Sequence, residues 1–356
     1  MFSEFVIAYL FLGGTGGGAL VVLALLECAN ARRRFTRTRI TSGLFSSPAE
    51  AGVAGGIGLA GASRLVGAAS AASAASAANT ANSLSAPTPR IRRLFALPDD
   101  VLRNGWVVCT VMLALGILFL FMDLGHPERV FALLTHPNLS AITVGAYALI
   151  AALICSAAFC LLALNGEYLL RPRGIYALAA LCVLAGVTVI LYTGILLANA
   201  PSVLIWMTPL VPVLFVLSSL SGGIACVMLG AAFANTRQVF DRVLIRLGDI
   251  DTALISLELV ALAAWLLWGI FTPGPDASAK ALIAGDLAPI FWAGLIFLGL
   301  ALPILMEQSL NYSNHKTQTL MVAALVLLGG ILLRVCVVGA GGFDVTQTGE
   351  FVSLLI

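Results

Sequence analysis

The segment from Asp123 to Arg129 concentrates ionisable side chains where a long apolar run ends. It reads Asp-Leu-Gly-His-Pro-Glu-Arg and follows residues 104–122, which hold no charged residue. Only 10% of the chain is charged, so such a cluster is unusual here. Carboxylate and imidazole groups at a membrane boundary can exchange protons with water beside a lipid-soluble molecule. The cluster suggests proton-linked chemistry at a membrane edge, with Asp123 and His126 as candidate groups.

The composition requires that this cluster sit on an integral membrane protein. Hydrophobic residues make up 60% of the 356 residues, and the mean hydropathy is +1.03. A soluble domain would carry roughly 25% charged residues. A membrane-spanning helix needs about 20 mainly apolar residues. We therefore predict an all-α protein with eight transmembrane helices, at about 5–28, 104–122, 139–164, 175–198, 208–234, 252–271, 288–306 and 319–341.

Lysine and arginine are distributed unevenly between the loops. Ten arginines lie in the 29–103 loop, and the loops after helices 3, 5 and 7 add six basic residues. The opposite loops hold only Arg129 and Lys280. Because basic loops stay in the cytoplasm, we expect both termini and the 123–138 loop to face outward from a cell inner or plasma membrane. Residues 46–90, rich in Ala and Ser, are expected to form a flexible cytoplasmic insertion.

The histidines and cysteines argue against a cofactor in this protein. A haem between membrane helices normally needs two facing histidines, but His126 and His136 fall in an outer loop and His315 in an inner one. The seven cysteines form no CxxC motif, so neither a disulfide frame nor a metal site is supported. We expect no haem, no metal site and no nucleic-acid partner.

Glycines dominate the middle of the first helix. Gly13 with Gly17, and Gly14 with Gly18, form small-xxx-small pairs that allow close helix packing. The alternative is that Gly14, Thr15 and Gly17 leave room for a flat ring beside the backbone.

Two aromatic residues mark the outer ends of later helices. Tyr192 could be an interfacial anchor or could donate its hydroxyl to a quinone oxygen. Trp206 lies in a charge-poor outer loop whose composition suits docking of another subunit. Arg129 and His136 are further candidates for that docking surface.

Three ionisable residues are predicted inside the membrane: Glu258, Arg334 and Glu27. Intramembrane charges are costly and are functional candidates by default, so all three are candidates for proton transfer. Arg334 could instead pair with Asp123 or a backbone carbonyl, and Glu27 could extend to the inner interface.

At these residues the chain resembles the NrfD/polysulfide-reductase family of membrane subunits. The matching segments are Tyr9–Gly14, the Asp123-Leu-Gly-His-Pro motif, Tyr192-Thr-Gly and Trp206-x-Thr-Pro-Leu-x-Pro. His126 departs from the pattern, since the family commonly has Arg there.

The resemblance implies an eight-helix quinol-interacting anchor of a multisubunit oxidoreductase, with no redox centre of its own. Two four-helix bundles are expected, 1–200 with the quinol site and 201–356. Asp123 and Tyr192 then carry over as partners of the quinone ring oxygens, with menaquinone or ubiquinone as the bound substrate. The expected partners are an outward-facing four-cluster ferredoxin-like iron–sulfur subunit and a molybdopterin catalytic subunit or multihaem cytochrome.

Two other interpretations of the sequence stay open. A secondary transporter of a small anion could use Arg334 as counter-charge, since such proteins often carry helices broken near the midplane. A pure membrane anchor would hold an enzyme without touching quinone.

Overall fold

The computed structural model describes the backbone of most of the chain. The described residues are 4–45, 97–124, 141–165, 172–200, 203–234, 241–272, 274–308 and 316–355. Contacts divide the chain into one unit of residues 1–28 with 97–356 and a second of 29–96. The predicted 46–90 insertion lies outside the described residues, and the helix packing is that of the first unit.

Helices make up the described residues, and no strand occurs within those ranges. The long ones are α1 (Glu4–Phe45), α4 (Asp99–Leu124), α6 (Ala141–Leu164), α7 (Pro172–Ala198), α8 (Leu210–Ala232), α9 (Asp241–Phe271) and α12 (Lys316–Leu355). A π-helical stretch, η2 (Ile290–Ala301), continues into α11 (Leu302–Gln308). The short elements are η1 (Leu204–Trp206) and α10 (Asp276–Ala284).

Within the described ranges, eight helices are long and apolar enough to cross a membrane. Each overlaps one of the eight spans expected from the sequence, so the prediction of a multi-pass all-α membrane protein is confirmed. The division into two four-helix bundles stays a prediction, because α8 packs against α4 and α7 as well as α9 and α12.

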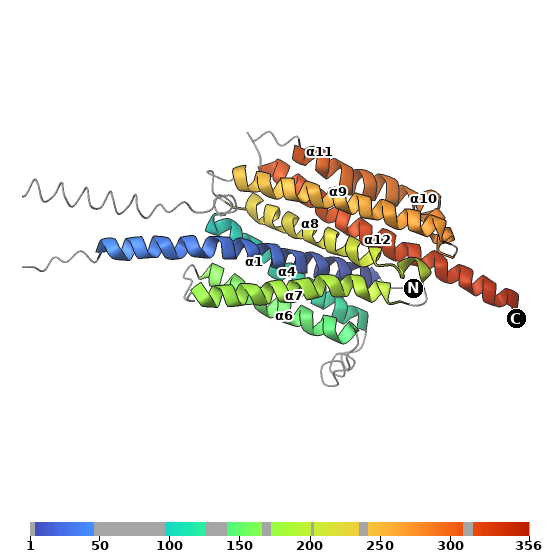
Figure 1. Ribbon diagram of the computed structural model, residues 1–356, viewed down its shortest axis with the longest axis horizontal. Coiled ribbons are helices and arrows are strands. Elements are labelled where there is room, and N and C mark those ends of the chain that lie inside the picture. The colour runs from blue at the N-terminus through green and yellow to red at the C-terminus, as the bar shows by residue number, and fades with distance from the viewer. Residues whose placement is uncertain are drawn as a thin grey trace, which may run out of the picture. The chain divides into compact units, whose positions relative to one another are not determined.

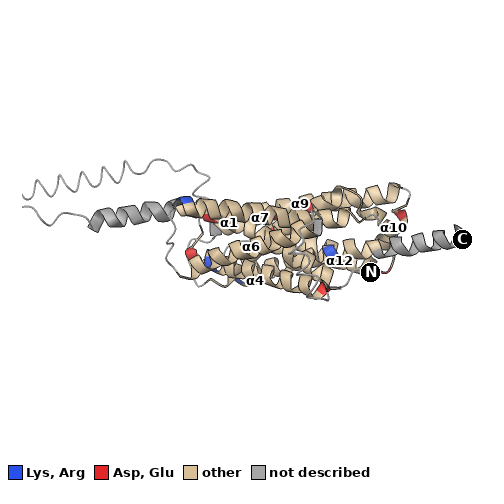
Figure 2. Cartoon of the chain, turned by 90° about the horizontal axis from the view of Figure 1, so that it is seen from below, with Lys and Arg blue, Asp and Glu red and all other residues tan. Residues whose placement is uncertain are grey.

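Successive long helices run in opposite directions, so the end of one helix lies at the same end of the bundle as the start of the next (Figure 1). We call the end at which α4 reaches Asp123 the Asp123 end; α1 begins there, and α7 and α9 end there. The opposite end, where α12 begins at Lys316, is the Lys316 end. Most of the described charged residues lie toward the two ends of the bundle (Figure 2).

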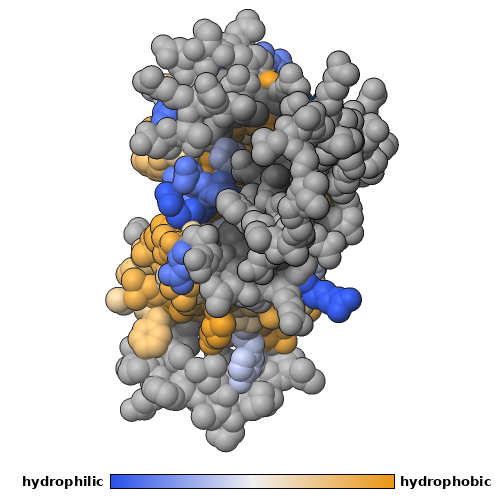
Figure 3. Space-filling view, turned by 90° about the vertical axis from the view of Figure 1, so that its left-hand side faces the viewer, coloured by the Kyte–Doolittle hydropathy of each residue, from blue (hydrophilic) through white to orange (hydrophobic). Residues whose placement is uncertain are grey.

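Helices α1 and α8 occupy the interior of the bundle. Most of their described side chains are buried, whereas α4, α6, α7 and α9 expose many large apolar side chains. Hydrocarbon can cover such surfaces at no cost. Figure 3 looks onto the Lys316 end, where both hydrophilic and apolar side chains reach the surface.

Glycines set the closest helix approaches. A Cβ at Gly18 of α1 would overlap the Ser219 carbonyl group of α8, and one at Gly223 would overlap the backbone at Gly18. A similar contact joins η2 to α12, where a Cβ on Gly299 would lie 2.6 Å from the Gly329 Cα. Small residues at these positions let backbones approach as membrane helix pairs require.

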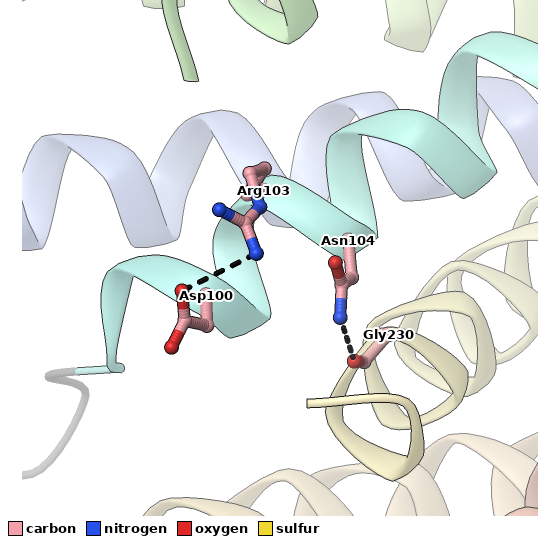
Figure 4. A network of polar contacts seen from close by, with 4 residues as sticks. All are labelled: Asp100, Arg103, Asn104 and Gly230. Atoms are coloured by element: carbon pink, nitrogen blue, oxygen red, sulfur yellow. Dashed lines mark hydrogen bonds and ion pairs between the residues drawn. The ribbon is translucent and has the colours of Figure 1, made fainter. Parts of the chain in front are cut away.

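Polar contacts hold the start of α4 at the Lys316 end (Figure 4). Asn104 donates a hydrogen bond from its side-chain amide to the Gly230 carbonyl of α8 at 3.3 Å. Arg103 and Asp100 form an exposed ion pair at 3.4 Å. The amide contact fixes α4 against α8, while the exposed pair contributes little.

Candidate functional site

The hydroxyl groups of Tyr9 and Tyr192 meet inside the bundle near the Asp123 end. Tyr9 lies in the second turn of α1 and Tyr192 near the end of α7, and their oxygens are 3.3 Å apart. Both side chains are buried. Gly145 of α6 makes room for the Tyr192 ring, since a Cβ there would overlap it. Two hydroxyls that bond each other leave one O–H proton outside that bond, so the pair can still donate to a ligand oxygen.

Asp123 lies at the same end, one residue before α4 ends. Its side chain is exposed and lies within electrostatic range of the Tyr9 hydroxyl. Two predicted site residues, Asp123 and Tyr192, therefore lie at the same end of the bundle, and Tyr192 contacts Tyr9. Tyr9 was not among the predicted site residues, although it opens the Tyr9–Gly14 motif.

Three predicted residues of this end cannot be placed. His126, Arg129 and His136 lie outside the described residues. Their roles at the rim and in partner docking stay predictions.

Protein atoms fill the space beside Gly14 and Gly17 of α1. A Cβ on Gly14 would lie 2.7 Å from the Ser219 Oγ and 3.1 Å from the Arg334 Nη2. A Cβ on Gly17 would lie 3.1 Å from the Gly186 carbonyl oxygen of α7. These contacts favour the packing interpretation of both glycines, and their part in holding a quinone ring stays a prediction.

Thr15 is buried between α1 and α8, where its side chain meets Gly222. Its Oγ1 has no hydrogen-bond partner. A buried hydroxyl without a partner costs free energy, so this atom could accept or donate a bond to a ligand group.

Arg334 is fully buried, in the half of the Lys316–Gly341 span that is nearer the Asp123 end. Its Nη1 donates to the Ser218 Oγ at 2.8 Å and to the Gly330 carbonyl at 2.9 Å, and its Nη2 donates to the Ser219 Oγ at 3.0 Å. Two aromatic rings flank the guanidinium group, those of Phe11 and Phe215. The expected pairing with a backbone carbonyl is therefore present, and the side chain links α12 to α8.

Glu258 and Glu27 are both buried. Glu258 interacts electrostatically with Arg334 and also contacts Ser218. The burial of Glu27 differs from the snorkelling interpretation, in which the side chain would extend to water. Proton transfer by Glu258, Arg334 or Glu27 stays a prediction.

Two further buried acids were missed from the sequence. Asp251 of α9 and Glu307 of α11 are buried and act on each other electrostatically. Asp251 precedes Glu258 by seven residues, which places both on one face of α9. This seven-residue spacing from Glu258 could have identified Asp251 from the sequence.

Trp206, a predicted docking residue, is held by the bundle. Its side chain is buried, and its indole N–H donates to the Val337 carbonyl of α12 at 2.7 Å. The Trp265 indole of α9 donates to the Ile205 carbonyl at 3.1 Å. Trp206 therefore anchors η1, and its part in partner docking stays a prediction. Leu204 and Met207 beside it are exposed.

The described residues include no group of three or more His, Cys, Asp or Glu side chains that could hold a metal ion. The seven cysteines are free thiols. At the loop between α9 and η2, the Lys280 ammonium holds the pKa of Asp276 below its usual range through a 2.9 Å ion pair.

Comparison with known proteins identifies the family. A profile described as polysulphide reductase, NrfD, matches residues 56–345. The chain belongs to the NrfD family. The match starts after α1, so Tyr9 and the α1 glycines precede it.

Individual members of the family are moderately similar to the chain. The polysulfide reductase C chain of Wolinella succinogenes is 29% identical over 263 residues, covering 68% of this protein and 82% of that one. Protein NrfD of Escherichia coli is 27% identical over 158 residues, covering 43% and 49%. The selenate reductase C subunit of Mesobacillus selenatarsenatis is 30% identical over 133 residues, covering 36% and 30%.

Proposed function

We propose that this chain is the quinol-interacting membrane anchor of an oxidoreductase complex. A membrane quinol binds near the Asp123 end, where Tyr9, Tyr192 and Asp123 come together. Electrons pass between the quinol and an iron–sulfur subunit docked on the same end. The observation that carries the proposal is the buried Tyr9–Tyr192 hydroxyl pair, at the same end of the bundle as the exposed Asp123.

The geometry supports a division of roles between the tyrosines and the acid. Tyr192, bonded to Tyr9, donates a hydrogen bond to one ring oxygen of the quinone. Oxidation of a quinol to a quinone releases two electrons and two protons. Asp123, at the exposed end of α4, accepts protons and passes them to water.

The relatives support an assembly with other subunits. Two of them are named as the C chain of polysulfide reductase and the C subunit of selenate reductase. In this protein the corresponding docking surface would include η1, where Leu204 and Met207 are exposed on a firmly held backbone. A molybdopterin subunit or a multihaem cytochrome would complete the complex.

We also propose that the Asp123 end faces outward. In the sequence, most lysines and arginines fall between helix termini that lie at the Lys316 end, and the positive-inside rule assigns such segments to the cytoplasmic side. Quinol oxidation at the Asp123 end would then release protons outside.

The proposal is tested by reduction of the partner's iron–sulfur clusters with added quinol in the purified complex. Asp123→Asn removes the proton acceptor and should slow reduction by about 100-fold or more. Tyr192→Phe removes one hydrogen bond of about 1.4 kcal/mol and should slow it about tenfold. Tyr176→Phe, on the same helix but toward the Lys316 end, is the matched control and should change nothing.

Unaltered rates in both Asp123→Asn and Tyr192→Phe would overturn the site assignment. A complex that assembles but neither contains nor oxidises quinol would indicate a pure anchor. A protein that purifies alone and moves an anion would indicate a transporter.

A further inference from the structure

A group of buried oxygens lies toward the Lys316 end, away from the proposed quinol site. It comprises Asp251 and Thr252 of α9, Glu307 of α11 and Ser221 of α8. Thr252 donates a hydrogen bond from its Oγ1 to the Glu307 Oε2 at 2.6 Å. Both Asp251 oxygens, the Glu307 Oε1 and the Ser221 Oγ are buried without a hydrogen bond. These four oxygens come from three helices and lie near one another, because Asp251 interacts with both Ser221 and Glu307.

The charges around this group are acidic. Asp249 acts on Glu307, and Glu258 acts on Asp251. The basic side chains of the adjoining α12 are engaged elsewhere. Lys316 donates to the Ala234 carbonyl at 2.6 Å, and Arg334 is held by α8 and acts on Glu258.

Two adjacent carboxylates in such surroundings cannot both be ionised. Burial removes the water that would stabilise each charge, and each negative charge opposes the other. A cation or a proton must neutralise the pair. Divalent cations take six or more oxygens, and four unpartnered ones do not supply them. A shared proton needs only one oxygen from each of the two carboxyl groups.

A hydrogen-bond donor distinguishes the two acids. The Thr252 hydroxyl donates to the Glu307 Oε2, and a donor of this kind stabilises the ionised form of the carboxyl group that accepts it. Glu307 is then the carboxylate, and the proton sits on Asp251, directed at the remaining Glu307 oxygen. The proton belongs to the pair as a whole.

We propose that Asp251 and Glu307 form a proton-binding site that holds one shared proton and exchanges it with water at the Lys316 end. Glu307 lies one residue before α11 ends, and Asp249 on the preceding turn of α9 is exposed. The site extends inward along one face of α8, where Ser221 lies beside Asp251 and Ser218 contacts Glu258. Its occupancy is thereby linked through Glu258 to Arg334.

Two measurements on the full-length protein test this site. Dicyclohexylcarbodiimide, an apolar reagent, modifies carboxyl groups only in their protonated form, and mass spectrometry locates the label. We expect one label per protein molecule on Asp251 or Glu307, decreasing as the pH rises. Infrared spectroscopy should show a protonated carboxyl band that Asp251→Asn removes. Asp286→Asn, an exposed acid at the opposite end, should leave both signals unchanged.

A variant separates a shared proton from a merely structural acid. Glu307→Gln removes the neighbouring negative charge, so Asp251 should ionise more easily and lose its label at a lower pH. The proposal is overturned if neither measurement detects a protonated acid at Asp251 or Glu307 in the natural protein. It is also overturned if sodium chloride, but not choline chloride, abolishes the label, which would show a sodium site. Quinol oxidation is not required for any of these results.

Discussion

At the scale of single residues, the glycines of α1 determine how closely the two interior helices pack. Gly18 faces the Ser219 backbone with no room for a side chain. Gly14 leaves the space that the Arg334 guanidinium and the Ser219 hydroxyl fill. The position of the buried arginine therefore depends on a glycine that belongs to a different helix.

A methyl group at Gly18 should destabilise the protein. Gly18→Ala would force α1 away from α8, and overpacking of this kind costs about 1–3 kcal/mol. The measurement is thermal unfolding of the detergent-solubilised protein, in which the midpoint should fall.

Gly248→Ala is the control for this prediction. The nearest atom to a Cβ at Gly248 is the Met228 Cε at 3.9 Å, and alanine favours a helix over glycine by up to about 1 kcal/mol. Its midpoint should stay the same or rise. Equal losses in both variants would show that Gly18 has no special role in packing.

Individual polar residues of the site were predictable, but their partners were not. Polar groups are rare in apolar helices, and this rarity identified Asp123, Tyr192, Glu258 and Arg334. Which of them meet depends on the rotation of each helix about its axis, and apolar sequences without a polar face leave that rotation undetermined. The Tyr9–Tyr192 contact therefore emerged only from the structure.

At the scale of elements, η1 is held to the bundle by two indole groups. Trp206 donates to α12, and Trp265 of α9 donates to the Ile205 carbonyl. A three-residue helix has too few internal hydrogen bonds to be stable alone. These two contacts explain how a short segment keeps a fixed position at the membrane edge.

Trp206→Phe should loosen η1. The substitution removes the N–H donor and leaves the buried Val337 carbonyl without that bond, at a cost of about 1–3 kcal/mol. Thermal unfolding should show a lower midpoint. Trp292→Phe is the matched control, since that indole also donates to a carbonyl, of Ile283, but from a half-exposed ring. A loss in Trp292→Phe as large as in Trp206→Phe would contradict this account.

The long helices were predictable from hydropathy, whereas the irregular elements were not. Eight apolar runs of about 20 residues leave the backbone no alternative to helix within a membrane. The π-helical stretch η2 and the short α10 were missed. Hydropathy does not distinguish π from α geometry, and α10 has too few apolar residues to resemble a span.

At the scale of the whole molecule, the two ends differ in charge and in chemistry. The Asp123 end combines the tyrosine pair with the exposed apolar residues of η1. In the sequence, most basic residues fall between helix termini that lie at the Lys316 end. The orientation of the protein therefore decides on which side of the membrane each proposed reaction would take place.

Single cysteines at opposite ends can establish this orientation. Asn199 and Asn165 are exposed next to the last residues of α7 and α6, at the Asp123 and Lys316 ends respectively. In intact cells a membrane-impermeant maleimide should label Asn199→Cys and should label Asn165→Cys only after permeabilisation. The natural protein is the control, since six of its cysteines are buried and Cys28 is partly so. The reverse pattern would place the Asp123 end inside.

The Trp206 hydrogen bond couples the position of η1 to that of α12. The carbonyl that Trp206 binds belongs to Val337, three residues after Arg334 and thus within one turn of α12. A displacement of η1 would therefore act directly on that turn. The hydrogen bonds from the Arg334 guanidinium to Ser218 and Ser219 would oppose such a displacement. The position of η1 and that of the buried charge are therefore linked.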